Sequence, residues 1–354
     1  PGGTCETAKA VAFTSGDCVF FVDGLRFDAG KRLRRALEAV GLTVSEEPFW
    51  AALPSVTATG KTAVTPVRDR ICGREGTLDF EPSVADTGQS LKGGHPLKKL
   101  LDDAGWSILD RSAVGDGQGK AWCECGDIDY EGHNRGWKLA KHLDALIAEI
   151  AARIRELVTA GWKRVRVVTD HGWLLVPGGL PKTDLPGAPT DNRWGRCAAL
   201  KTGAISEERL FPWYWNSSQY FALADGVSCF RKGEEYTHGG LSLQECLTLH
   251  LTVTPGEAVH AAAAIELTDV AWKRLRCTVA VDGNYAGLSL DIRSQAGNAL
   301  SSVVVSRKPL KENGIASVVV VDEELEGQEA TVVLIDSQGM LLAQYPTVIG
   351  GGDR

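Results

Sequence analysis

Two short, largely apolar runs, each followed at once by acidic or histidine side chains, constrain the fold of this 354-residue chain more than any other feature. Residues 19–22 read VFFV and are followed by Asp23-Gly24. Residues 165–168 read VRVV and are followed by Thr169-Asp170-His171. Short apolar runs that end in turn-forming residues are typical of strands buried inside a sheet.

An amphipathic helical pattern accompanies each of these runs. After the first run, Leu33 and Leu37 share one face, and Gly41 ends the pattern. Before the second run, a long apolar stripe covers residues 139–157 and ends at Gly161. Strands that alternate with amphipathic helices predict an α/β fold whose sheet contains parallel strands.

The pattern changes after about residue 255. Short β-rich runs follow one another, separated by turns such as Asp282-Gly283-Asn284, and no long helix intervenes. Such a succession predicts a small all-β sandwich. We therefore expect two domains, residues 1–254 and residues 255–354. Within the first domain, residues 60–120 fit the alternation poorly, and we expect them to form an insertion over the rim of the sheet.

Composition and charge exclude several classes of protein. The formal net charge of −7 argues against a broad nonspecific nucleic-acid surface but leaves room for a local basic groove. No uncharged apolar run reaches about 18 residues, so no membrane span or membrane partner is expected. The nine cysteines are odd in number and scattered, which favours a reducing cytoplasm. Because the chain starts at Pro1 and its one methionine is Met340, we expect a fragment of a longer protein.

The residues that carry chemistry lie in four short motifs: Asp23-Gly24, Asp129-x-x-Gly-His133, Asp170-His171 and His238-Gly239. In open α/β sheets, ligands bind beyond the carboxyl ends of the strands, and three of the motifs follow such ends, so they can converge. Carboxylates and imidazoles suit zinc and similar ions, and a pair of ions stabilises an in-line phosphoryl displacement. One ion would be held by Asp129, His133 and His238, and a second by Asp23, Asp170 and His171.

A nucleophile is then needed beside the second ion. The segment Pro54-Ser55-Val56-Thr57 offers Thr57, whose hydroxyl would become reactive once a metal lowers its pKa. Ser55 and Thr59 lie close by in the sequence and offer alternative hydroxyl groups. Arg26 directly follows the first metal motif and could contact a phosphate; a salt bridge on the first turn of the helix is the alternative interpretation.

At this point the motifs resemble a known group of enzymes. In chain order, they are similar to the alkaline phosphatase superfamily, and most similar to its nucleotide pyrophosphatase/phosphodiesterase branch: Asp23, Pro54-x-x-Thr57, Asp129-x-x-Gly-His133, Asp170-His171-Gly172 and His238-Gly239. Four further stretches resemble the PglZ proteins of BREX phage-defence systems: residues 22–26 (VDGLR), 168–173 (VTDHGW), 177–182 (PGGLPK) and 236–242 (YTHGGLS).

The resemblance implies an alkaline-phosphatase-like mixed sheet flanked by helices, followed by the small β domain. It also implies the role of each residue. Asp23, Thr57, Asp170 and His171 would hold the ion that activates the nucleophile. Asp129, His133 and His238 would hold the ion that faces the leaving group. The ions would be zinc, or else manganese.

The implied function is a metal-dependent phosphodiester hydrolase, a nuclease or phosphodiesterase, that acts in a BREX-type phage-defence system. Thr57 would attack phosphorus and form a phosphothreonine intermediate. The partners would be a nucleic acid or nucleotide substrate and other BREX proteins. Two alternatives remain at this stage: a phosphomonoesterase that uses the same site, and a scaffold in which the metal is structural and which binds other BREX components.

Overall fold

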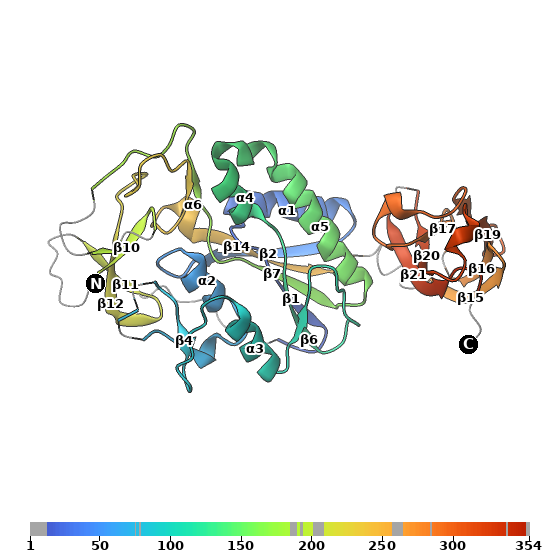
Figure 1. Ribbon diagram of the computed structural model, residues 1–354, viewed down its shortest axis with the longest axis horizontal. Coiled ribbons are helices and arrows are strands. Elements are labelled where there is room, and N and C mark those ends of the chain that lie inside the picture. Colours follow the sequence, from blue (N-terminus) through green and yellow to red (C-terminus); the bar gives the residue numbers. More distant parts are fainter. Residues whose placement is uncertain are drawn as a thin grey trace. The chain divides into compact units, whose positions relative to one another are not determined.

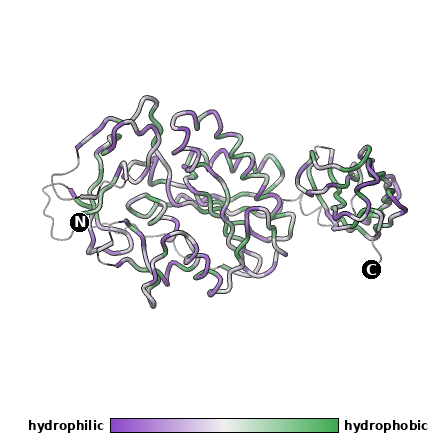
Figure 2. Tube along the Cα trace, viewed as in Figure 1, coloured by the Kyte–Doolittle hydropathy of each residue, from purple (hydrophilic) through white to green (hydrophobic). Residues whose placement is uncertain are grey.

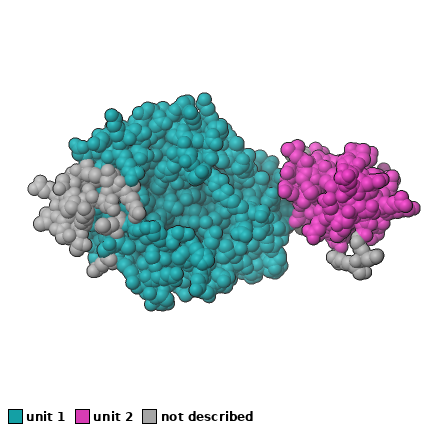
Figure 3. All heavy atoms as spheres, in the orientation of Figure 1, with its two compact units in different colours: residues 1–254 teal, residues 255–354 magenta. Residues whose placement is uncertain are grey.

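The computed structural model describes residues 13–74, 76–77, 79–184, 190–191, 194–200, 209–256, 265–283, 285–337 and 339–351. The chain divides into two compact units between Thr254 and Pro255, shown in teal and magenta in Figure 3.

A six-stranded mixed sheet forms the centre of the first unit (Figure 1). Across the sheet, its strands are β2 (Thr43–Trp50), β14 (Leu247–Thr254), β7 (Arg164–Val168), β1 (Asp17–Phe21), β6 (Lys120–Glu124) and β5 (Ser107–Leu109). The strands β7, β1, β6 and β5 pair in parallel, whereas β14 is antiparallel to both β2 and β7.

Helices lie on both faces of this sheet. The helices α1 (Phe27–Ala39) and α5 (Leu143–Thr159) pack together on one face, and α3 (His95–Asp103) lies on the other (Figure 1). The predicted α/β class, with a mixed sheet flanked by helices, is confirmed. The predicted helical stripe from residue 139 is split, because Leu139 lies in a short 3-10 helix (Gly136–Lys141) and α5 begins at Leu143.

The central position of strand β1 in the sheet explains why its residues 18–21 form a continuous apolar run. Val19 and Phe21 face α3 and pack beside Trp122 of β6. Cys18 and Phe20 point to the opposite face, and all five residues of the strand are buried. A strand covered on both faces has no polar side, so the alternation of polar and apolar residues disappears. Figure 2 shows hydrophobic residues along the strands in the middle of this unit.

The segment expected to be an insertion, residues 60–120, contains a two-stranded ribbon and part of the main sheet. The ribbon is formed by β3 (Ile71–Cys72) and β4 (Ser83–Val84). Strand β5, near the end of the segment, pairs with β6 at the edge of the central sheet. Helix α3 and strand β5 therefore belong to the sheet's own framework, while the ribbon lies outside it.

Shorter elements complete the first unit. They are α2 (Thr57–Ala63), α4 (Ile128–Arg135), α6 (Leu243–Cys246), and the pair β8 (Leu174–Leu175) with β13 (Tyr236–Thr237). A further antiparallel sheet contains β9 (Thr190–Asp191), β10 (Cys197–Leu200), β11 (Leu210–Trp213) and β12 (Asn216–Leu223).

The second unit is built from two antiparallel sheets. One contains β15 (Glu266–Lys273), β16 (Arg276–Asp282) and β19 (Ile315–Val319). The other contains β18 (Lys308–Pro309), β17 (Ser289–Arg293), β20 (Glu329–Ile335) and β21 (Leu341–Val348). Side chains of both sheets, among them Val279, Leu290, Val318 and Val332, share one apolar core. This is the small all-β fold that the sequence predicts.

Across the described parts of both units, no helix combines the length and the apolar character needed to cross a bilayer.

Candidate metal centre

Three neighbouring strands bring the acidic residues together. Asp23 lies two residues after β1, and Asp170 lies two residues after β7. Asp129 follows β6 and occupies the first turn of α4. Because β7, β1 and β6 are adjacent and parallel, their carboxyl ends meet at one edge of the sheet.

The first cluster contains Asp23, Asp170 and His171, which offer ligand atoms that all lie within 4.8 Å of one another. Thr57, the first residue of α2, enters this cluster. Its hydroxyl oxygen lies 3.1 Å from Nε2 of His171 and 3.5 Å from Oδ1 of Asp23. The four residues that the sequence groups around one ion are therefore neighbours in space.

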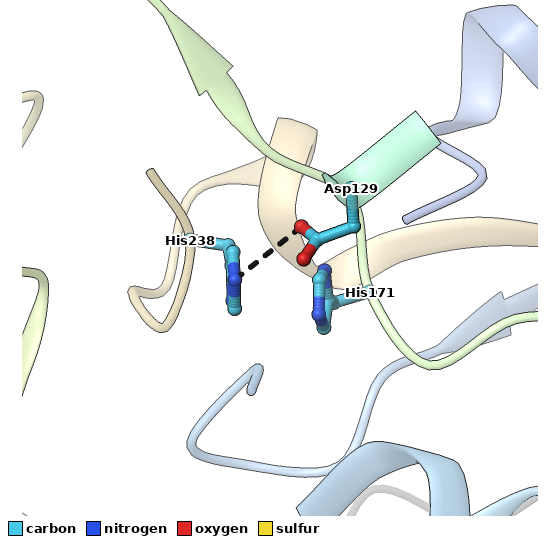
Figure 4. A group of neighbouring side chains, drawn as sticks. All are labelled: Asp129, His171 and His238. Carbon is cyan, nitrogen blue, oxygen red and sulfur yellow. Dashed lines mark ion pairs between the residues drawn. The ribbon is translucent and has the colours of Figure 1, made fainter. Parts of the chain in front are cut away.

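The second cluster surrounds Asp129. Nε2 of His238 lies 3.5 Å from Oδ1 of Asp129, and Nε2 of His133 lies 3.5 Å from Oδ2. The two histidine nitrogens are 3.1 Å apart. His171 joins the two clusters, because its ring stacks on that of His238 with 3.8 Å between the ring centres (Figure 4).

Of the three hydroxyl groups in the segment 55–59, only that of Thr57 contacts the clusters. The hydroxyl of Ser55 is buried and donates to the carbonyl oxygen of Gly240. Thr59 is also buried; its hydroxyl donates to the carbonyl oxygen of Phe80 and accepts from the indole of Trp213. The hydroxyl groups of Ser55 and Thr59 are therefore both engaged in hydrogen bonds inside the fold.

The donor set fits a divalent cation. Oδ1 of Asp170 accepts from the backbone N–H groups of Gly24 and His171, but the buried Oδ2 accepts no hydrogen bond. Burial raises the pKa of Asp23 well above its usual value, and the negative charges of Asp170 and Asp129 raise it further. A cation at this position would supply the missing partner and relieve the repulsion between the carboxylates.

Asp129 is held in its charged form by its own surroundings. Burial would raise the pKa of this carboxyl, but His238, His171 and His133 outweigh it and lower the pKa. The hydroxyl of Tyr236 also donates to Oδ1 of Asp129 over 2.8 Å. Burial lowers the pKa of both His133 and His171, whereas the negative charge of Asp129 raises it.

Two glycines permit these close approaches. The segment around Gly132 is helical, and helix spacing places Asp129 and His133 on one face of α4. A Cβ atom at Gly132 would lie 2.3 Å from the ring of Tyr236. A Cβ atom at Gly60 would lie 2.8 Å from the backbone oxygen of Asp170, so this glycine lets α2 approach the metal cluster.

Two residues that hold the candidate metal ligands in place, Tyr236 and Glu245, were not predicted from the sequence. Besides Tyr236, the buried Glu245 accepts from the backbone N–H of Gly240 and forms an ion pair with Arg196. The same loop is tied to the nucleophile segment, because Nδ1 of His238 lies 3.0 Å from the carbonyl oxygen of Ser55. The signal for Glu245 was present as a capping box, Ser242-x-x-Glu245, at the start of α6.

Arg26 does not enter the centre. Its guanidinium binds the carboxylate of Asp28 through two hydrogen bonds of 2.6 and 2.8 Å and lies 3.7 Å from the centre of a Trp173 ring. This is the salt bridge at the start of the helix that the sequence offered as the alternative to phosphate binding.

Two cavities adjoin the centre, and both are lined by Asp129 and His133. The larger, of about 490 Å³, extends toward Lys61, Lys98 and Trp122. The smaller, of about 260 Å³, extends past Thr57. Arg26 lines neither cavity.

Comparisons with known proteins give little further guidance. No protein-family model and no curated protein sequence matches the chain. Among solved structures, an inactive variant of murine ectonucleotide pyrophosphatase/phosphodiesterase 5 in complex with AMP is similar to 67% of this chain and 87% of its own. The sequence identity is 10% and the TM-score is 0.42. A likeness of this size does not establish a shared activity.

Proposed function

We propose that the chain is a metal-dependent phosphodiesterase in which Thr57 is the nucleophile. One observation carries the proposal: the Thr57 hydroxyl lies beside His171 and Asp23, while the adjoining Asp170 presents a buried oxygen without a hydrogen bond. Asp23, Thr57, Asp170 and His171 would hold one ion, and Asp129, His133 and His238 the other. A structural metal site would not need a hydroxyl nucleophile among its ligands.

The two ions would acidify the Thr57 hydroxyl and neutralise charge at the phosphoryl and leaving oxygens. The hydroxyl oxygen of Thr57 attacks phosphorus, its O–H proton passes to solvent, and the bond between phosphorus and the leaving oxygen breaks. Water then attacks the phosphothreonine, which restores the hydroxyl and releases the phosphate ester. Helix α2 holds Thr57 in place during both steps through the contact between Gly60 and Asp170.

Two cavities favour a diester over a monoester. A phosphodiester carries two organic groups, and the larger and smaller cavities open from the same pair of residues, Asp129 and His133. Each ester group could occupy one cavity while phosphorus faces Thr57. A monoester would fill one cavity and leave the other to water.

The finer assignments rest on the sequence resemblance. We propose zinc, or else manganese, as the metal, a nucleic acid or nucleotide as the substrate, and other proteins of a BREX-type defence system as partners. We place the activity in the cytoplasm, where the eight free cysteines in the described part of the chain would stay reduced.

The test compares hydrolysis of bis(p-nitrophenyl) phosphate with that of p-nitrophenyl phosphate, with zinc, with manganese and with a chelator. Thr57→Ala should abolish turnover while the protein keeps its metal, measured by elemental analysis. Thr57→Ser, which retains a hydroxyl group, should retain part of the activity.

Three other results of this experiment would favour a different function or a different nucleophile. Preference for the monoester would indicate the phosphatase. Full activity in Thr57→Ala would exclude this nucleophile. Metal binding without hydrolysis of either ester would favour the scaffold.

A further inference from the structure

The larger cavity is lined by two lysines, Lys61 and Lys98, and by Glu124. Lys61 pairs with Oε2 of Glu124 over 2.7 Å. The other oxygen of Glu124 accepts from the indole of Trp122 over 3.0 Å. Both oxygens of Glu124 therefore have partners, and neither is bonded to Lys98.

The ammonium group of Lys98 forms no hydrogen bond or ion pair with any described residue, although the side chain is half-buried and lines the cavity. Burial would raise the pKa of Glu124, but Lys61, Trp122 and Lys98 together hold it below its usual value. The positive charge of Lys98 therefore acts inside the cavity. The carboxylate of Glu124 is already paired with Lys61.

The other charges in this cavity are accounted for. Arg111 is paired with Asp127 through two hydrogen bonds. Asp23 and Asp129 belong to the metal centre. Asp110 is exposed to solvent. Among the described residues that line this cavity, Lys98 is therefore the cation without an ion pair, and the ligand it suits is an anion.

The cavity is placed to receive part of the substrate. Asp23, Asp129 and His133 line both the cavity and the metal centre, so an ester group on the phosphorus attacked by Thr57 would enter it directly. A volume of about 490 Å³ lies in the range of small-molecule sites. In nucleotide substrates, the anion nearest to the reacting phosphate is another phosphate.

We propose that Lys98 binds a second phosphate group of the substrate, so that the enzyme prefers nucleotide chains or nucleoside polyphosphates to isolated diesters. The inference rests on the phosphodiesterase function proposed above. Lys98 is a specificity-determining residue in this account and takes no part in the bond-breaking step.

Matched probes separate this role from catalysis. The p-nitrophenyl ester of thymidine 5′-phosphate is compared with the same ester carrying an additional 3′-phosphate. ATP is a further substrate, in which the additional phosphate groups belong to the leaving group. The variants are Lys98→Met and Lys99→Met. Lys99 is the control because it is the next residue of α3, is exposed and does not line the cavity.

We expect wild-type kcat/KM to be higher for the ester with the 3′-phosphate, for ATP, or for both, and Lys98→Met to reduce that preference by about tenfold. Lys99→Met should leave the preference unchanged. Loss confined to the 3′-phosphate ester would identify a nucleotide chain, and loss confined to ATP a polyphosphate leaving group. An unchanged preference in Lys98→Met, or an equal loss in Lys99→Met, would overturn the proposal.

Binding provides a readout that does not need turnover. Thymidine 3′,5′-bisphosphate and thymidine 5′-phosphate are titrated calorimetrically into the zinc-loaded protein and both variants. Tighter binding of the bisphosphate that disappears in Lys98→Met supports the inference even if Thr57 proves not to be the nucleophile. Equal affinity for the two nucleotides in the wild type, together with an unchanged preference for ATP in Lys98→Met, would contradict it.

Discussion

Each of the two units buries an aspartate almost completely, and the two aspartates have opposite surroundings. In the second unit, Asp291 accepts hydrogen bonds from Arg293, Arg307, Ser302 and the backbone of Ile292. In the first unit, Asp170 keeps one oxygen without a hydrogen bond and lies beside the carboxylate of Asp23. Both carboxylate oxygens of Asp291 have partners within the chain, whereas the partner that we propose for the unbonded oxygen of Asp170 is a cation.

The difference distinguishes a buried carboxylate that stabilises the fold from buried carboxylates that we propose bind a ligand. A buried charge paired within the chain stabilises the folded state wherever metal is absent. A cluster of unpaired carboxylates destabilises the metal-free protein and is stabilised by binding. The effect of a substitution at Asp170 should therefore depend on metal, whereas the effect of a substitution at Asp291 should not.

The largest effect is expected for Asp170→Asn. Removing this charge should lower kcat/KM by on the order of a thousandfold, because the ion beside Thr57 loses a ligand. Metal at one hundred times its Kd stabilises a protein by about 2.7 kcal/mol, and the variant should lose most of that gain. Without metal, the variant should be at least as stable as the wild type. Thermal unfolding with and without zinc checks this; an unchanged zinc-dependent shift in Tm would contradict it.

Asp291→Asn should instead destabilise the second unit by about 3 kcal/mol, with zinc or without it, since Arg293 would stay buried beside a neutral partner. Urea denaturation measures the change. The control is Asp269→Asn, an exposed acid on β15 of the same unit, which should change stability by less than about 0.5 kcal/mol. Dependence of the Asp291→Asn effect on zinc would break the contrast between the two aspartates.

Gly132→Ala should cost about 2 kcal/mol of stability and weaken zinc binding, because the added methyl group collides with the ring of Tyr236. The collision can be tested with a double-mutant cycle that uses Tyr236→Ala. If the ring is the cause, adding Gly132→Ala to Tyr236→Ala should cost little more. Additive effects would show that the glycine is required for another reason.

The smallest effect concerns His250, which stacks on Phe49 with 4.0 Å between the ring centres. Burial lowers its pKa to about 4 in the folded protein, from 6.5 when exposed. The neutral ring is favoured by folding, so this contribution is present above pH 6.5 and is lost as the pH falls toward 4. Between about pH 7 and about pH 5.5, metal-free wild type should lose about 1 kcal/mol more than His250→Gln.

The exposed His142 is the control for this pH dependence. Urea denaturation of His142→Gln at the same two pH values should follow the wild type. If His250→Gln also follows the wild type, the burial of His250 is not the source of the effect.

Much of the central architecture could be predicted from local pattern. The runs at 19–22 and 165–168 are buried, and all of their side chains except that of Arg166 are apolar, so the strands β1 and β7 are visible in the sequence. The pairing of β14 between β2 and β7 was not visible. It joins segments about two hundred residues apart, and strand propensity does not encode the partner.

The candidate site shows the same division. Asp23, Asp129, Asp170 and His171 could be grouped because residues that follow adjacent parallel strands meet at one edge. That rule does not indicate what each side chain contacts. It left Arg26 as a candidate phosphate ligand and overlooked Tyr236 and Glu245, whose contacts to the site cross more than one element.

The order of apolar runs and amphipathic stripes was enough to predict the α/β class and the β-rich end, because these follow from periodicity and from rules that act within a few residues. The assignment of the seven candidate metal-site residues depended also on their resemblance to a known superfamily. Packing decided the rest. It turned the hydroxyls of Ser55 and Thr59 into the interior and that of Thr57 toward His171. It also left one oxygen of Asp170 without a donor. Such choices depend on what distant segments place beside a side chain, and no local pattern contains that information.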